Sequence, residues 1–157
     1  MKKDKSILYY LLKFRVLIIF IVMFLIMSVV SDNFLTQNNI LNMLRQCAFN
    51  GMLAVGMTFV LITGGIDLSV GSILSFSAIV GCSFVTTGSP YPPIVGIIVA
   101  VAIGLAIGLF NGALVAYGKV PAFIVTLGSQ LMAAGAALVF NNGSPVSNLK
   151  ESYNIIG

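Results

Sequence analysis

The sequence predicts an all-α, polytopic membrane protein, a bundle of about five transmembrane helices with a cytoplasmic amino terminus. Three observations predict this fold. Hydrophobic residues make up 59% of the 157 residues, and the mean hydropathy is +1.08. Charged residues make up only 8%, against about 25% in a typical soluble domain, which is too few to cover a water-facing surface. Apolar runs recur between short polar stretches, and each is near the length that crosses a bilayer.

The first fifteen residues, 1–15, form a basic segment ahead of the first apolar run. This segment holds Lys2, Lys3, Lys5, Lys13 and Arg15. Basic clusters also occur in proteins that bind nucleic acid. Here a long apolar run follows at once, which is typical of the cytoplasmic flank of a membrane helix. We therefore expect contact with membrane lipid and no nucleic-acid partner.

The expected spans are residues 16–30, 40–62, 70–85, 94–116 and 122–140. Asn38 or Asn39 is placed to cap the second span. The stretch TTGSPYPP separates the third span from the fourth, because three prolines and a glycine favour a loop. YGKVP separates the fourth span from the fifth. Residues 16–140 are therefore the expected transmembrane portion, and the polar, turn-rich residues 141–157 are an expected extracytoplasmic loop.

The placement of basic residues predicts the orientation. With the amino terminus inside, Lys119 also lies inside, whereas Arg45 and Lys150 lie outside. Cytoplasmic flanks carry an excess of Lys and Arg, so this orientation fits. A cleaved signal peptide ending near Val29-Val30-Ser31 is the alternative for the amino terminus. Because four more apolar spans follow, an uncleaved first helix is the simpler interpretation.

The fourth span carries a small residue at every fourth position. The stripe consists of Gly96, Ala100, Gly104, Gly108, Gly112 and Ala116. Helices in lipid associate through close backbone approach, which small residues permit. The stripe therefore predicts tight packing of this helix in a bundle. A looser set in the fifth span, which includes Gly128, Ser129 and Ala133, predicts the same for that helix.

Several polar residues within the spans need an explanation, because amides and carboxylates are costly in hydrocarbon. The candidates for a substrate path are Asn50, Asp67, Ser69, Ser72, Asn111, Thr126 and Gln130. Asp67 is the only charged residue between Arg45 and Lys119, and an aspartate at a helix centre costs about 2.5–3.5 kcal/mol on insertion scales. We expect these side chains to face protein or a watery path.

Asp67 lies in ITGGIDLSVGS, and two interpretations of it are compatible. In the first, Gly64 and Gly65 end the second helix and Asp67 caps the third, where a carboxylate accepts free backbone N–H groups. In the second, the break lies at membrane depth and lines a pathway, since transporters use broken helices to bind substrate.

Catalysis has little support in the sequence. There is no histidine, and Cys47 and Cys82 are isolated from each other in apolar surroundings. Intramembrane aspartyl chemistry needs two carboxylates that share a proton, and only Asp67 lies deep enough in the expected transmembrane portion. The sequence also contains no GxxxxGK[ST] phosphate loop. We therefore expect no enzyme activity, no metal and no cofactor of its own.

Three stretches of the sequence, which contain most of these polar residues, resemble a known family. LNMLRQCAFNGMLAVGMTFVLITGGIDLSVGSILSFSAIV, then GLFNGALVAYGKVPAFIVTLG and NNGSPV, are similar to the membrane permeases of bacterial ABC sugar importers of the ribose type. The resemblance covers roughly Ile40 to Val146. It marks as hallmark positions Gly65, Asp67, Leu68, Ser69, Gly71, Ser72, Asn111, Gly112, Pro121, Thr126, Leu127, Gly128, Gly143 and Pro145.

The resemblance implies a permease subunit in the bacterial cytoplasmic (inner) membrane. Such a subunit pairs with a second permease copy or a paralogue and receives a monosaccharide from an extracytoplasmic sugar-binding protein. A cytoplasmic ATP-binding subunit hydrolyses ATP, so the permease itself needs no cofactor. A neutral sugar requires no counter-ion, which favours the structural interpretation of Asp67 as helix cap and organiser of the break.

The resemblance also implies that the family pattern continues past Gly157 with further spans and a loop that docks the ATPase. We therefore expect an amino-terminal portion of such a permease. The alternative is a non-transporting membrane scaffold or assembly fragment derived from one.

Overall fold

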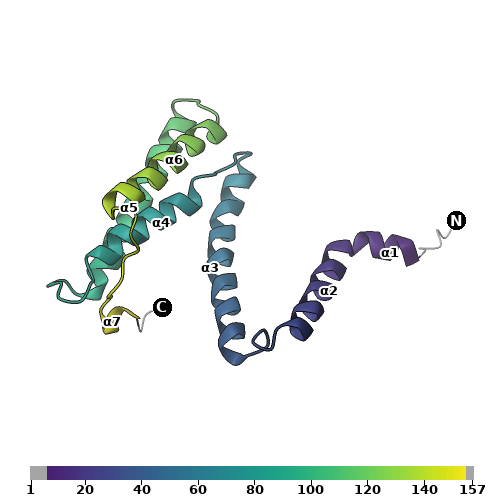
Figure 1. Ribbon diagram of the computed structural model, residues 1–157. Coiled ribbons are helices and arrows are strands. Elements are labelled where there is room, and N and C mark those ends of the chain that lie inside the picture. The colour runs from purple at the N-terminus through teal and green to yellow at the C-terminus, as the bar shows by residue number, and fades with distance from the viewer. Residues whose placement is uncertain (1–6, 155–157) are drawn as a thin grey trace. The chain divides into compact units, whose positions relative to one another are not determined.

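The computed structural model describes residues 7–154, and they are almost entirely helical (Figure 1). The helices are α1 (Ile7–Lys13), α2 (Arg15–Val30), α3 (Gln37–Ile62), α4 (Val70–Ser83), α5 (Pro93–Ala116), α6 (Ala122–Phe140) and α7 (Glu151–Asn154). Within the described residues the only β pairing is an isolated antiparallel bridge between Thr86 and Leu149. The all-α prediction is confirmed.

Each of the five expected spans coincides with a helix, from α2 to α6. Three of them, α3, α5 and α6, are long and apolar enough to cross a membrane, whereas α2 and α4 are shorter apolar helices. The 14 residues of α4 measure about 21 Å at 1.5 Å per residue, less than a hydrocarbon core of about 30 Å. The helix begins at Val70 as expected and ends at Ser83, two residues before the expected end at Val85.

Contacts divide the chain into two compact units, residues 1–52 and 53–157. In the first unit, α2 runs without a buried residue, and Phe24 packs edge-on against Phe34 with ring centroids 5.1 Å apart. Of the basic segment expected at 1–15, residues 1–6 lie outside the described residues, so Lys2, Lys3 and Lys5 are not described.

The start of α3 differs from the expectation. The helix begins at Gln37, and the first helical turn closes when the Ile40 N–H donates to the Thr36 carbonyl at 3.0 Å. Asn38 and Asn39 both lie inside this turn, so the prediction that one of them caps the helix is wrong. The Asn39 amide instead donates backward to the Phe34 carbonyl at 2.7 Å, which fixes the preceding turn.

In the second unit, α4 packs against both α5 and α6 (Figure 1). Glycines of α4 and α5 lie close together. A Cβ added at Gly81 would lie 2.6 Å from the Gly96 carbonyl oxygen, and one added at Gly96 would lie 2.7 Å from the Gly81 carbonyl oxygen. Small residues thus let these two backbones touch, as expected for helices in lipid.

Only the first two positions of the α5 stripe meet a neighbour in this way. Ala100 lies against Gly81, but Cβ atoms at Gly104, Gly108 or Gly112 would find no heavy atom within 4 Å apart from the adjoining backbone of α5 itself. Ala116 is exposed. Within the described chain the stripe therefore packs only at its amino-terminal end. The sequence had predicted packing along the whole helix.

The segment that follows α6 is bonded to the turn between α4 and α5. The Lys150 N–H donates to the carbonyl of the fully buried Val85 at 3.0 Å, and the Lys150 ammonium donates to the Tyr91 carbonyl at 2.7 Å. The Cys82 thiol donates to the Tyr153 hydroxyl, and burial raises the pKa of Tyr153. Residues of the expected loop 141–157 thus pack on the turn between α4 and α5.

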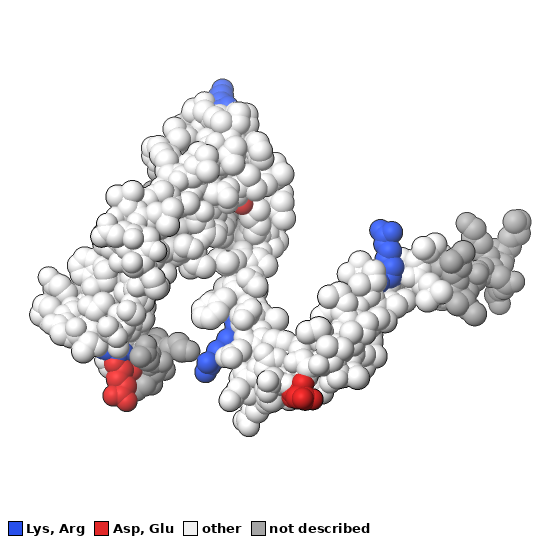
Figure 2. Space-filling model, viewed as in Figure 1, with Lys and Arg blue, Asp and Glu red and all other residues white. Residues whose placement is uncertain are grey.

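The surface is as apolar as the composition predicts. The described core is small, with Val80, Val85, Val125, Ala133 and Ala137 as its buried hydrophobic residues. Most large apolar side chains are exposed instead, and Figure 2 shows a face on which charged side chains are few and separated. An outer surface of this kind is stable in lipid, not in water.

Candidate functional site: a polar network at the break before α4

The break begins where two glycines end α3. Gly64 has a φ of +79°, in the left-handed region that a residue with a Cβ adopts only at a cost. The Gly64 N–H donates to the Leu61 carbonyl at 3.0 Å, and the Gly65 N–H donates to the Val60 carbonyl at 3.1 Å. These two bonds form a Schellman motif, which pairs the last free carbonyls of a helix. The prediction that Gly64 and Gly65 end this helix is confirmed.

Asp67 organises the next turn, although it is not the helix cap. One carboxylate oxygen, Oδ1, accepts the Ser69 backbone N–H at 2.7 Å and the Ser69 hydroxyl at 2.5 Å. Ser69 is the N-cap residue of α4, and its side chain makes no capping bond. The prediction that Asp67 caps α4 is therefore wrong in detail, because the carboxylate fixes the cap residue two positions along the chain.

A chain of buried hydrogen bonds then joins this turn to two other helices. The Asn111 amide on α5 donates to the Ser69 hydroxyl at 3.2 Å. The Ser129 hydroxyl on α6 donates to the Asn111 side-chain carbonyl. Ser69 is 0% exposed, Asn111 5% and Ser129 2%. Each donor in this Asp67–Ser69–Asn111–Ser129 network thus has an acceptor, as buried polar groups require.

Thr126 on α6 holds the same turn at a second point. Its hydroxyl oxygen accepts the Leu68 backbone N–H at 3.2 Å and lies 3.2 Å from the Ile66 carbonyl oxygen. The same hydroxyl lies 2.8 Å from the Ala122 carbonyl oxygen of its own helix. With only 3% of its surface exposed, Thr126 pairs backbone groups that the irregular segment would otherwise leave free.

Four of the candidate residues predicted from the sequence therefore meet at the break: Asp67, Ser69, Asn111 and Thr126. Gly65 lies beside them, since a Cβ there would be 3.3 Å from the Ala122 Cβ. Gln130 is half-buried on α6 and takes no part in the network. Asn50 is exposed on α3 and belongs to the other unit.

Sequence reasoning assigned Ser129 only to helix packing and missed its place in the network. One signal could have identified it. Ser129 follows Thr126 by three residues, so both lie on the same face of α6. Both are also buried. A helix that presents two hydroxyls on one face, in a chain with few polar residues, is placed to bond a broken neighbour.

Two pockets flank the network within the second unit. The first, which we call the Asp67 pocket, has a volume of about 690 Å³. Its lining comes from the end of α3, the break, the second half of α5 and the start of α6, and it includes Asp67, Asn111, Thr126 and Lys119. It also includes Gly108 and Gly112, two of the stripe positions that meet no neighbour.

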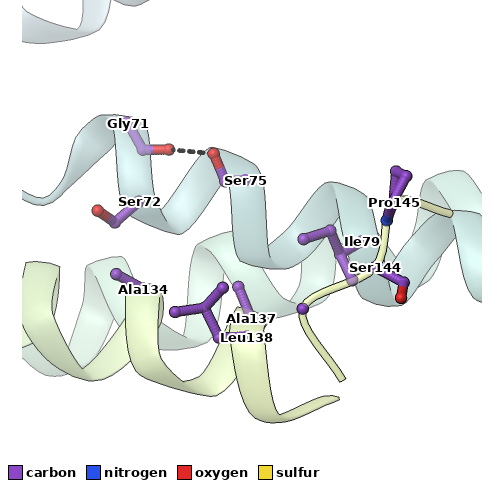
Figure 3. A pocket seen from close by; sticks show the side chains of 10 residues that line it. Gly71, Ser72, Ser75, Ile79, Ala134, Ala137, Leu138, Ser144 and Pro145 are labelled. Carbon is purple, nitrogen blue, oxygen red and sulfur yellow. Dashed lines mark hydrogen bonds between the residues drawn. The ribbon is translucent and has the colours of Figure 1, made fainter. Parts of the chain in front are cut away.

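The second pocket, which we call the Ser72 pocket, has a volume of about 550 Å³ and lies between α4 and α6 (Figure 3). Gly71, Ser72 and Ser75 line it from α4, while Ala134 lines it from α6. No charged side chain is part of this lining. The Ser75 hydroxyl donates to the Gly71 carbonyl at 3.0 Å, which leaves its oxygen free to accept. In residues 7–154 no group of three His, Cys, Asp or Glu side chains could hold a metal ion.

Replacing Asp67 separates the role of its oxygen from that of its charge. Asp67→Asn keeps a side-chain oxygen that can accept both bonds from Ser69, so we expect little loss of stability. Asp67→Leu leaves the Ser69 N–H and hydroxyl without this acceptor, which costs about 1–3 kcal/mol. Denaturant unfolding of the purified chain in detergent, followed by circular dichroism, measures both. Equal losses for the two variants would show that the charge itself is needed.

Comparisons with known proteins give the family. A family model described as branched-chain amino acid transport system / permease component matches residues 39–154. The ribose import permease protein of Escherichia coli is 44% identical over 149 residues, which are 94% of this chain and 46% of that protein. The ribose import permease protein of Bacillus subtilis is 42% identical over 132 residues, 84% of this chain and 40% of that protein.

A xylose relative is about as similar. The xylose transport system permease protein of Haemophilus influenzae is 44% identical over 135 residues, 83% of this chain and 35% of that protein. The chain thus spans about half the length, or less, of these curated relatives. No solved structure matches it. Because the family model covers well over half of the sequence, including the break and every residue of the network, the chain belongs to the permease-component family of branched-chain amino acid transport systems.

Proposed function

We propose that this chain is part of a transmembrane permease subunit of an ATP-driven importer, which moves a monosaccharide such as ribose across the bacterial cytoplasmic membrane. The observation that carries the proposal is the similarity to ribose and xylose permeases, which spans 83% or more of the chain in each of the three relatives named above. The apolar outer surface and the three membrane-length helices support a place in the membrane.

The break before α4 supports a transport role on physical grounds. Irregular backbone at membrane depth is tolerated only beside protein or a watery cavity. Here it is paired by side chains from α5 and α6 and is bordered by the Asp67 pocket. A helix break of this kind beside a cavity is where transporters bind and pass their substrates.

The two pockets suit different parts of a path for a neutral sugar. The Ser72 pocket offers hydroxyl groups and small side chains without charge, which fits a neutral molecule rich in hydroxyls. In the Asp67 pocket, the carboxylate has one oxygen engaged with Ser69, and the side chain is half-buried. Its main role in this proposal is to fix the turn, and its second oxygen can accept a sugar hydroxyl.

The proposal assigns energy coupling and substrate delivery to partners. A cytoplasmic ATP-binding subunit hydrolyses ATP, an extracytoplasmic binding protein delivers the sugar, and a second permease copy or paralogue completes the path. The chain itself makes no covalent change to the sugar and binds no cofactor.

A membrane scaffold or assembly partner is the second candidate. The observation that favours it is the open part of the α5 stripe, where Gly104, Gly108 and Gly112 meet no neighbour within the described chain. Small residues left open on a membrane helix suit close approach by another helix. This function would need no substrate path.

Uptake of labelled sugar tests the proposal. The chain is expressed in cells that lack their own ribose and xylose permeases and carry the matching binding protein and ATPase. It is supplied in two forms: the chain alone, and the chain joined to the carboxy-terminal half of the Escherichia coli ribose permease. We expect ATP-dependent uptake of ribose or xylose from at least the joined form, and its loss with Asn111→Leu. Membrane insertion of both forms without uptake of either sugar would contradict the proposal and favour the scaffold.

A further inference from the structure

The irregular segment between α3 and α4 is held unequally along its length. Its end at Ser69 is fixed by the carboxylate of Asp67 and by the amide of Asn111, and Ser69 is fully buried. Its middle, Ile66 to Leu68, bonds α6 only through Thr126, and its other hydrogen bonds among the described residues are the local ones from Ser69 to the Asp67 carboxylate. The Leu68 N–H and the Ile66 carbonyl have no other hydrogen-bond partner among the described residues.

The Thr126 hydroxyl has one proton and three carbonyl oxygens within reach. These belong to Ala122 at 2.8 Å, Ile66 at 3.2 Å and Phe123 at 3.4 Å. A threonine in a helix readily donates to the carbonyl four residues back, so Ala122 competes with Ile66 for the same proton. When the proton goes to Ala122, the segment keeps only the bond from Leu68. The contact with Ile66 can therefore be given up without leaving the hydroxyl proton unpaired, and the bond from Leu68 is the one that must break to release the segment.

The same segment forms part of the wall of a cavity. Gly65 and Asp67 line the Asp67 pocket together with Thr126 itself. On one side the segment is bounded by Gly64, whose left-handed backbone ends α3, and on the other by the anchored Ser69. A displacement of residues 66–68, between Gly65, whose N–H bonds the Val60 carbonyl, and Ser69, would change the size of the pocket without moving α4.

We propose that residues 66–68 are a gate over the Asp67 pocket and that Thr126 is its latch. Release of the two Thr126 contacts lets the gate move, while the network through Asn111 and Ser129 keeps α4 in place. The inference depends on the geometry of the break and not on which molecule the protein carries, so it can hold whether or not the uptake experiment succeeds.

Hydrogen exchange of backbone amides in lipid nanodiscs tests the gate in the unmodified chain. We expect the Leu68 amide to exchange faster than the Val80 amide in the middle of α4, because its only acceptor is the latch. A Leu68 amide as protected as that of Val80 would overturn the proposal, since the segment would then open only together with the helix bundle.

Variants of Thr126 identify the latch. Thr126→Val removes the hydroxyl at nearly constant volume and should speed exchange at Leu68 about fivefold to tenfold, with Val80 unchanged. Thr126→Ser keeps the hydroxyl and should stay within about twofold of the unmodified chain. Thr58→Val is the matched control, because the Thr58 hydroxyl bonds only the Ala54 carbonyl of its own helix. Unchanged exchange at Leu68 in Thr126→Val, or an equal rise at Val80, would overturn the role of Thr126.

Discussion

Replacement of Gly81 by leucine is expected to separate α4 from α5 and to cause the largest loss of stability of any single change considered. Even the Cβ would lie 2.6 Å from the Gly96 carbonyl oxygen and 2.9 Å from the Ala100 Cβ. Neither atom belongs to the flexible end of a side chain, so relief requires the helices to move apart. Overpacking of this kind costs about 1–3 kcal/mol, and the larger leucine side chain should reach or exceed the upper value.

A matched pair of alanine variants isolates the contact from helix propensity. Gly81→Ala and Gly104→Ala both add a methyl group within a helix, which on its own favours alanine by about 1 kcal/mol. Gly104 has no heavy atom near its added Cβ, so Gly104→Ala should be neutral or stabilising, whereas Gly81→Ala should destabilise. Denaturant unfolding in detergent measures both. The same effect from the two variants would contradict the close packing of α4 on α5.

Replacement of Asn111 by leucine is expected to have the second largest effect. Leucine has a similar volume but neither donates to Ser69 nor accepts from Ser129, and both of those side chains are buried. Each polar group left without a partner costs about 1–3 kcal/mol. We expect a loss of about 2 kcal/mol or more in the same unfolding assay.

Asn50→Leu is the matched control for this change. Asn50 also lies within a helix, but it is exposed, so the same substitution should change stability by about 0.5 kcal/mol or less. If Asn111→Leu were no more destabilising than Asn50→Leu, the buried network would contribute nothing to the fold.

The helices themselves were predictable because each is an apolar run bounded by residues with a clear local effect. Gly64 and Gly65 stop α3 through backbone conformations that need no tertiary information. Pro93 likewise begins α5, since a proline at the first helical position loses no hydrogen bond. The predicted cap of α3 was wrong because several neighbouring residues could begin that helix at similar energy. Thr36, Asn38 and Asn39 can all bond a helix start, and the turn at Phe34 decided between them.

The site was predictable in its members but not in its connections. The cost of burying an amide singles out Asn111 in the sequence, but its partners Ser69 and Ser129 are 42 and 18 residues away along the chain. Asp67 was expected at the cap because carboxylates favour helix starts. The tight turn after Gly65 instead places its oxygen against the cap residue. The α5 stripe marks positions for close approach, but periodicity alone does not say which positions a neighbour occupies.

A continuous hydrogen-bond network ties the break before α4 to both α5 and α6. A double-mutant cycle between Ser69→Ala and Ser129→Ala tests it most directly, because these two residues are linked only through Asn111. We expect a coupling energy of at least about 0.5 kcal/mol in detergent unfolding, which should vanish when the cycle is repeated with Asn111→Ala. Stability losses that add within about 0.3 kcal/mol in the unmodified chain would contradict it.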